Sequence, residues 1–152
     1  MALANEWHAQ HLREIGIRGN LGKALRSSES LMEKWEGLSI TNFRYENSDL
    51  VWNIRQLCTI QELINEGRKM KHCVASYAHK CSNMYCGIFN VSRFFKSVDV
   101  TESVATIQVS SQYEIVQIRG KCNSIVNGKA LGIIKRWAQQ NRLKHNSYLL
   151  ID

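Results

Sequence analysis

The stretch ATIQVSSQYEIVQIRG, Ala105 to Gly120, decides the fold class that the sequence predicts. Two runs rich in β-branched residues flank the polar tetrapeptide Ser110–Tyr113, and apolar and polar side chains alternate within each run. Alternation with a period of two around a short polar turn is the pattern of a β-hairpin. We therefore predict strands over 104–109 and 114–119.

The register of this hairpin divides its side chains between two faces. If Val109 pairs with Glu114, Thr106 lies opposite Gln117 and Gln108 lies opposite Ile115. The expected core face carries Ala105, Ile107, Val109, Val116 and Ile118, and the expected polar face carries Thr106, Gln108, Gln117 and Arg119. A polar row on a sheet either faces solvent, which is the commoner case, or lines a site.

Further elements are predicted on both sides of the hairpin. Helical periodicity and capping signals alternate with strand signals. The predicted elements are helices over 2–14 and 21–36, a strand over 50–55, a helix that opens at Thr59 and closes at Gly67, a helix over 71–82, a strand over 88–95, a final helix capped by Asn127 and an edge strand over 148–151. We expect an α+β fold with N-terminal helices, two motif-bearing helices, a three-stranded antiparallel meander and a C-terminal helix.

Length and composition indicate one domain. The chain has 152 residues, of which 44% are hydrophobic and 22% charged, and it contains no proline. We predict a single domain over 1–152, in which a helical extension over 1–48 packs on a core over 49–152. No run is long and apolar enough for a membrane span. The polar N-terminus and the odd count of five cysteines favour a cytoplasmic protein with reduced thiols.

The segment Glu66–Tyr77 places an acid, an imidazole, a thiol and a phenol within twelve residues. His72 and Cys73 fall near the predicted start of a helix, where the macrodipole lowers a thiol pKa. Adjacent helical residues point about 100° apart, so the two would need a further partner to form a catalytic group. The alternative is a buried Cys73 and a His72 bonded to backbone.

Metal and phosphate motifs are not evident. The spacings of His72, Cys73, His79, Cys81 and Cys86 differ from those of zinc fingers and ribbons, and no glycine-rich phosphate loop is present. We expect neither a metal nor a cofactor.

The charge balance favours a polyanionic partner. Twenty Lys and Arg against thirteen Asp and Glu give a net charge of +7. Such basic residues can equally be a solvated surface. The candidate nucleic-acid-binding residues are Arg68, Lys69, Lys71, Arg119, Lys121, Lys135, Arg136 and Arg142.

Several separated blocks resemble the PcfJ-like protein family. The resemblance runs from about Trp52 to Trp137 and resides in Glu66-Gly67, Met70, His72-Cys73-Val74, Tyr77, Cys81, Gly87-Ile88-Phe89, Thr106–Val109 and Gln117–Asn123. The first blocks match the family signature "EG..M.HCV.SY...C". Gln108 stands where the family strand often carries Glu, and family members are usually longer.

The resemblance implies a functional site and a biological setting. The family is named after a conjugative-plasmid gene, which implies work with nucleic acid on a plasmid or phage. It also implies a site, whose residues form the candidate catalytic set: Glu66, His72, Cys73, Tyr77, Gln117 and Asn123.

Three functions follow as hypotheses. The first is a nucleic-acid-associated accessory protein of a mobile genetic element. The second is a Cys/His-dependent enzyme acting on a nucleotide or acyl substrate. The third is an interaction or inhibitor module that docks on a host nucleic-acid-handling complex. None of the three involves a membrane, and the sequence assigns no oligomeric state.

Overall fold

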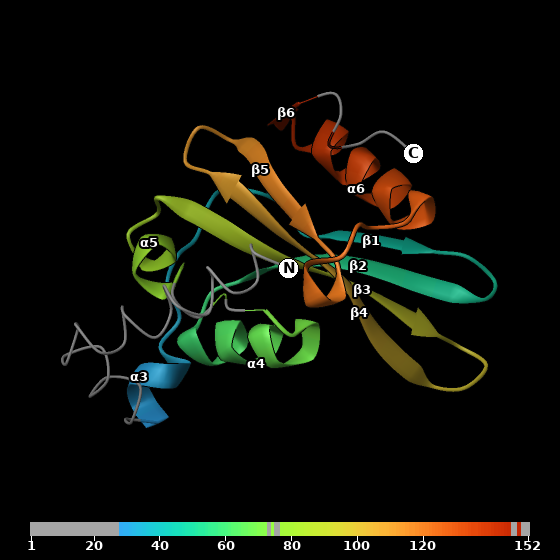
Figure 1. Cartoon of the computed structure of the whole chain (residues 1–152), viewed down its shortest axis with the longest axis horizontal. Helices are drawn as coiled ribbons and strands as arrows, with labels where there is room; N and C mark the ends of the chain where they lie inside the picture. Colours follow the sequence, from blue (N-terminus) through green and yellow to red (C-terminus); the bar gives the residue numbers. More distant parts are fainter. Residues whose placement is uncertain (1–27, 73, 75–76, 147–148, 150–152) are drawn as a thin grey trace.

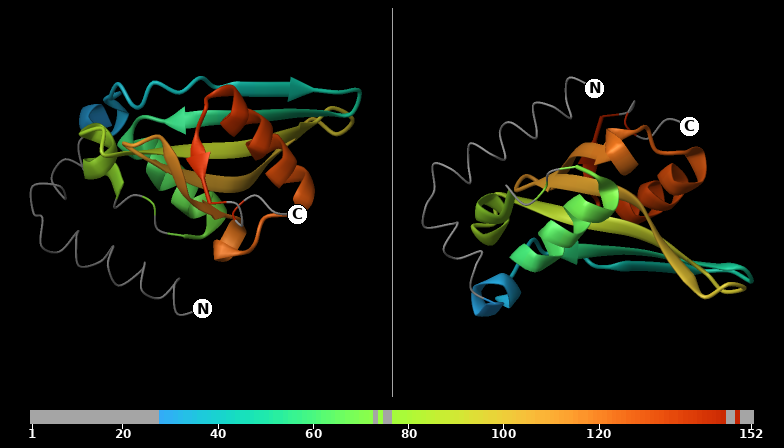
Figure 2. Two further views of the ribbon diagram at one scale, coloured as in Figure 1. Left: turned by 90° about the horizontal axis from the view of Figure 1, so that it is seen from above. Right: turned by 60° about the horizontal axis from the view of Figure 1, so that its bottom comes forward.

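Six strands form one curled sheet, a half-barrel (Figure 1, Figure 2). The computed structural model describes residues 28–72, 74, 77–146 and 149. Strand order follows chain order, and each neighbouring pair is antiparallel except the last, which is parallel. The described elements are α3 (Ser28–Met32), β1 (Phe43–Glu46), β2 (Leu50–Leu57), α4 (Ile60–Met70), α5 (Ala78–Ser82), β3 (Cys86–Phe95), β4 (Val100–Ser110), β5 (Glu114–Arg119), η2 (Lys121–Asn123), α6 (Gly128–Gln140) and β6 (Lys144–His145).

The two faces of the sheet pack against different helices. One face and α6 enclose the larger core, in which the ring centroids of Phe89 and Trp137 lie 4.9 Å apart. The other face packs against α4 and α5 through a smaller apolar cluster of Leu57, Leu63, Val74, Ala78, Cys81, Cys86 and Ile88. The sheet therefore separates two cores of unequal size.

α6 forms where the sequence predicts a helix. The side chain of Asn127 accepts a hydrogen bond from the backbone N–H of Ala130 at 3.0 Å, which caps the first turn. Ala130, Ile134, Trp137 and Ala138, which are spaced to lie on one face of this helix, are buried against the sheet. The Nε1–H of Trp137 also donates to the carbonyl of Thr41 at 3.1 Å.

α4 begins as predicted but ends later. The hydroxyl of Thr59 accepts from the N–H of Glu62 at 3.0 Å, as a capping motif requires. The helix continues through Gly67 to Met70, and Lys71 ends it in the left-handed conformation with φ 55°. The prediction that Gly67 closes the helix was therefore wrong. Glycine is needed there because a Cβ would lie 2.7 Å from the carbonyl oxygen of His72.

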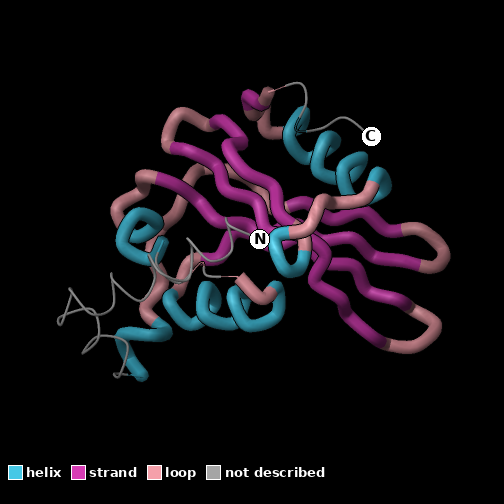
Figure 3. The backbone as a smooth tube through the Cα atoms, in the orientation of Figure 1, coloured by secondary structure: helices cyan, strands magenta, loops and turns pink. Residues whose placement is uncertain are grey.

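The predicted fold class was wrong. The described chain is rich in strands, with few short helices and a six-stranded mixed sheet instead of a three-stranded meander (Figure 3). Strand β1 forms inside the predicted helical extension over 1–48, and β6 is two residues long. The predicted helix over 2–14 and most of the tail strand lie outside the described residues, and α3 covers only part of the helix predicted over 21–36.

Two local predictions also need correction. The helix predicted over 71–82 is, in the described residues, only α5, because the backbone turns left-handed at Lys71. In the hairpin, a β-bulge between Gln108 and Val109 shifts the register, so that Val109 pairs with Ile115. Ile115 is consequently core, and Val116, predicted to be core, is 45% exposed.

Candidate functional site

The sheet face under α4 carries three cross-strand rows. The middle row joins four polar side chains of four strands through the registers Arg55–Asn90, Asn90–Thr106 and Thr106–Arg119. The inner row, beside it under α4 and α5, is Leu57, Ile88, Gln108 and Gln117. The outer row, on the other side, is Arg44, Asn53, Ser92 and Ser103. Directly opposed residues share a face, so the polar side chains of the three rows lie on one surface, whose apolar members are Leu57 and Ile88.

The side chain of Glu66, on α4, contacts the middle row of the sheet. It lies on the buried stripe of α4, between Leu63 and Met70, and is 3% exposed. Its carboxylate accepts a hydrogen bond from the hydroxyl of Thr106 at 2.6 Å. The amide of Asn90 donates to both of its oxygens, at 2.8 and 3.1 Å. Three donor contacts thus satisfy a carboxylate that packing alone would exclude from this position.

His72 completes a chain of three side chains. Its Nε2 lies 3.0 Å from the hydroxyl oxygen of Thr106, and the residue is 6% exposed. Because Thr106 has one hydroxyl hydrogen and gives it to Glu66, we assign a protonated Nε2 that donates to Thr106. The chain therefore runs from imidazole through hydroxyl to carboxylate.

Burial shifts the pKa of both ends of this chain toward the neutral form. Desolvation raises the pKa of Glu66, and the hydrogen bonds from Thr106 and Asn90 oppose that shift only in part. Desolvation also lowers the pKa of His72 to about 4. At neutral pH the imidazole is uncharged, so it can act as a base but not as a charged acid.

A small cavity adjoins this chain of side chains. It has a volume of about 10 Å³ and is lined by Val74, Tyr77, Ile88, Thr106, Gln108, Gln117 and Arg119. That volume is room for about one water molecule. Thr106 contributes to both the cavity wall and the hydrogen-bonded chain, so the predicted residues Glu66, His72, Tyr77 and Gln117 belong to one neighbourhood.

Two other predicted residues are placed differently. Cys73 lies outside the described residues. Asn123 lies in η2, which packs beside α4, and its Oδ1 is buried without a hydrogen bond from any described residue. The helix start that was expected to activate Cys73 is not at that position, since α5 begins at Ala78.

The predicted nucleic-acid-binding residues divide into two groups. The α4-side cations are Arg68, Lys69, Lys71, Arg119 and Lys121, from α4, its C-cap, β5 and η2. The α6-side cations are Lys135, Arg136 and Arg142, on or just after the helix that covers the opposite face (Figure 1). The guanidinium of Arg136 lies 4.9 Å from the ring centroid of Tyr45.

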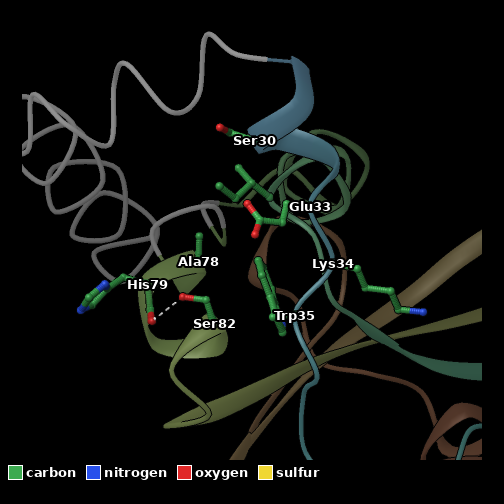
Figure 4. A pocket seen from close by; sticks show the side chains of 8 residues that line it. Ser30, Glu33, Lys34, Trp35, Ala78, His79 and Ser82 are labelled. Carbon is green, nitrogen blue, oxygen red and sulfur yellow. Dashed lines mark hydrogen bonds between the residues drawn. The ribbon is translucent and has the colours of Figure 1, made fainter.

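A separate hollow lies between α3, the start of α4 and α5 (Figure 4). Its volume is about 400 Å³, and its lining includes Glu33, Trp35 and His79. Its described lining contains none of the candidate catalytic residues. Within the described ranges, no three His, Cys, Asp or Glu side chains gather closely enough to hold a metal ion.

Sequence reasoning missed Asn90 and the role of Thr106. Asn90 stands alone in the apolar run from Gly87 to Val91, and a lone buried amide there was a usable signal. Thr106 was placed on the polar face but not in the site. Its partners Glu66 and His72 are 40 and 34 residues away, so only the folded sheet reveals the chain.

Fold and site together define a class: a single-sheet, strand-rich protein with a buried carboxylate–hydroxyl–imidazole chain under one helix. A model of the PcfJ-like protein family matches residues 18–130, and the chain belongs to that family. The resemblance noted in the sequence is thereby confirmed. No curated protein and no solved structure matches the chain. No helix of the described residues has the length and apolar character needed to cross a bilayer.

Proposed function

We propose that this PcfJ-like protein is a cytoplasmic nucleic-acid-binding accessory protein of a mobile genetic element, and that the α4-side cations form its binding surface. The observation that carries the proposal is that these five cations come from adjoining elements on the α4 side and form no ion pair with a carboxylate of the described residues. The ion pairs of the described chain use Arg44, Arg55, Arg93 and Lys96 instead.

The position of these cations supports a phosphate-binding role. Arg68 and Lys69 occupy the last turn of α4, and Lys71 caps it, all three exposed. η2, which carries Lys121, packs beside the same helix. Cations at a helix C-terminus also interact favourably with its dipole, but that effect does not require Lys121 or Arg119. A phosphate backbone would neutralise several of these charges and release counterions.

Fluorescence anisotropy with labelled single- and double-stranded DNA and RNA, over a salt series, tests this proposal. We expect salt-sensitive binding whose slope reports about 0.7 to 0.9 counterions per phosphate contact. The variant Lys69→Gln/Lys71→Gln should weaken binding at least about tenfold and flatten the slope. The matched control, Lys135→Gln/Arg136→Gln, removes the same charge from the opposite face and should bind like the wild type.

Two results would overturn the proposal. A wild-type protein that binds none of the four probes at low salt removes nucleic acid as the ligand. Equal losses in the two double variants would mean that net charge alone attracts the probes, so the α4-side cations would not be the surface.

A second candidate function is an acid–base enzyme. The observation that favours it is the chain from Glu66 through Thr106 to His72 beside a cavity lined by Gln108, Gln117 and Arg119. For the version with a Cys73 nucleophile we expect fast alkylation by iodoacetamide at neutral pH. The experiment needs Cys122→Ser, since Cys122 is an exposed thiol. A Cys73 that is inert in the native protein contradicts that version.

A further inference from the structure

The outer row lies in an open hollow that the proposed function does not use. This hollow has a volume of about 410 Å³, in the range of small-ligand sites. Its polar lining comes from Asn42, Arg44, Asn53, Arg55 and Ser92, on β2, β3 and the start of β1. The hollow borders the first turn of α4, since Arg55 in its lining pairs with Glu62 of that helix.

Two central side chains of the hollow are not used by the fold. Asn53 and Ser92 are cross-strand partners and half-buried. Neither side chain makes a hydrogen bond with any described residue, whereas the amide nitrogen of Asn90, in the next row, donates to Glu66 and Ser103. An amide and a hydroxyl side by side offer three donor hydrogens and two acceptor oxygens to a ligand.

The charges around the hollow favour an anionic ligand. Arg44 and Arg55 line it, and the part of its lining that the structure describes includes no acidic side chain. Arg44 pairs with Glu46 at 3.0 Å and Arg55 pairs with Glu62, but both arginines are more than half exposed. Exposed ion pairs contribute little, so a phosphate could compete for either guanidinium.

We propose that the outer row binds one unpaired nucleotide of a single-stranded nucleic acid, with its phosphate at Arg44 and Arg55 and its base edge at Asn53 and Ser92. This inference rests on the proposed function and names its substrate class. Phosphate contacts position a strand, whereas amide and hydroxyl contacts read base edges. In a duplex the Watson–Crick edges are paired and the bases are stacked within the helix, so only an unpaired base can place that edge in a hollow on a sheet face.

The test compares a fluorescein-labelled 12-nucleotide single strand with the duplex of the same sequence, in DNA and RNA. We expect Asn53→Ala to weaken single-strand binding about tenfold while duplex binding and the salt slope stay unchanged, because the amide carries no charge. Arg44→Gln should weaken binding and reduce the slope by about 0.7. Gln139→Ala removes an exposed amide from α6 and should bind like the wild type.

Competition separates a nucleotide site from a phosphate site. Nucleoside monophosphates should displace the single strand at concentrations where inorganic phosphate does not. Equal displacement by phosphate would reduce the hollow to an anion site and overturn the base contact. If Asn53→Ala alters the melting temperature, Ser92→Ala serves as the second variant, with the same expected loss.

Failure of this inference differs from failure of the proposed function. If Lys69→Gln/Lys71→Gln loses binding and Asn53→Ala and Ser92→Ala do not, the proposed function stands and the outer row is a hydrated surface. If Asn53→Ala weakens single strand and duplex equally, the hollow does not select unpaired bases and this inference falls. If the wild type binds no probe, both fall.

Discussion

The two faces of the sheet differ in the kind of side chain that they bury. The face against α6 is mainly apolar, and the largest side chains of its core, Trp137 and Phe89, are fully buried. The face against α4 buries Glu66, His72, Asn90 and Thr106 instead. Hydrophobic burial stabilises the first arrangement directly. The polar arrangement on the α4 face is stable only if each buried polar group has a hydrogen-bond partner, because a buried group without one loses the free energy of its hydration. Packing alone therefore does not account for this arrangement.

The difference between the two faces supports the proposed position of the functional site on the α4 face. A small domain gains little stability from a buried carboxylate when an apolar side chain of similar size would fill the same space. The α4 face nevertheless carries polar side chains in all three rows, a small cavity and an open hollow, whereas the α6 face adjoins the larger apolar core. We infer that the α6 face mainly stabilises the fold and that the α4 face carries the functional site.

The largest expected effect tests the assignment of stability to the α6 face. Trp137→Ala should lower the free energy of unfolding by about 3 to 5 kcal/mol, because it removes a fully buried indole and its hydrogen bond to Thr41. Glu66→Gln, on the other face, should change it by no more than about 1 kcal/mol, since it removes a buried charge and preserves shape. Urea denaturation of both variants measures the two values. Similar losses would contradict the comparison.

A glycine in each helix gives a smaller, matched test. Gly67→Ala in α4 places a Cβ 2.7 Å from the carbonyl oxygen of His72, a backbone atom that cannot move aside cheaply. We expect a loss of about 1 to 3 kcal/mol. Gly132→Ala in α6 meets nothing within 4 Å and should stabilise the protein by up to about 1 kcal/mol. Thermal unfolding measures both, and equal signs would mean that the loop after α4 yields to the added methyl group.

The sequence predicted the α6 face well and the α4 face poorly. α6 has a capping residue and a stripe of period 3.6, which are local signals, so Asn127 and Trp137 were placed correctly. The same kind of stripe after Lys71 was misleading. Val74 and Ala78 are buried because they pack in one cluster with Leu57 and Ile88, and α5 itself begins only at Ala78. The spacing of these buried residues resembles that of a helix, but it results from tertiary packing.

The sheet and the site depended on pairings that one sequence does not reveal. β1 has four residues in which aromatic and charged side chains alternate, and a run this short was not predicted as a strand. Because of the bulge after Gln108, Ile115 is buried in the core and Val116 is exposed, the reverse of the prediction. Glu66 and His72 were identified as candidates, but the hydroxyl that joins them comes from a distant strand.

The last prediction concerns the pH dependence of the α4 face. The pKa of His72 falls from 6.5 to about 4 on folding, because burial disfavours the charged imidazole. Between those values the unfolded chain binds a proton that the folded chain does not. Stability from His72 is therefore complete above pH 6.5 and is lost as the pH falls toward 4, with a slope of up to about 1.4 kcal/mol per pH unit.

Glu66 contributes in the opposite direction. Its raised pKa means that the folded chain holds a proton the unfolded chain has released, so its contribution falls as the pH rises through that pKa. His72→Gln isolates the imidazole, since a glutamine amide can still donate to Thr106 but does not titrate. The difference between the wild-type and His72→Gln unfolding free energies, measured by urea titration from about pH 4 to 8, should change below pH 6.5 and stay constant above it. A difference that is flat throughout would mean that His72 is accessible to protons in the folded protein, and the closed chain through Thr106 would have to open in solution.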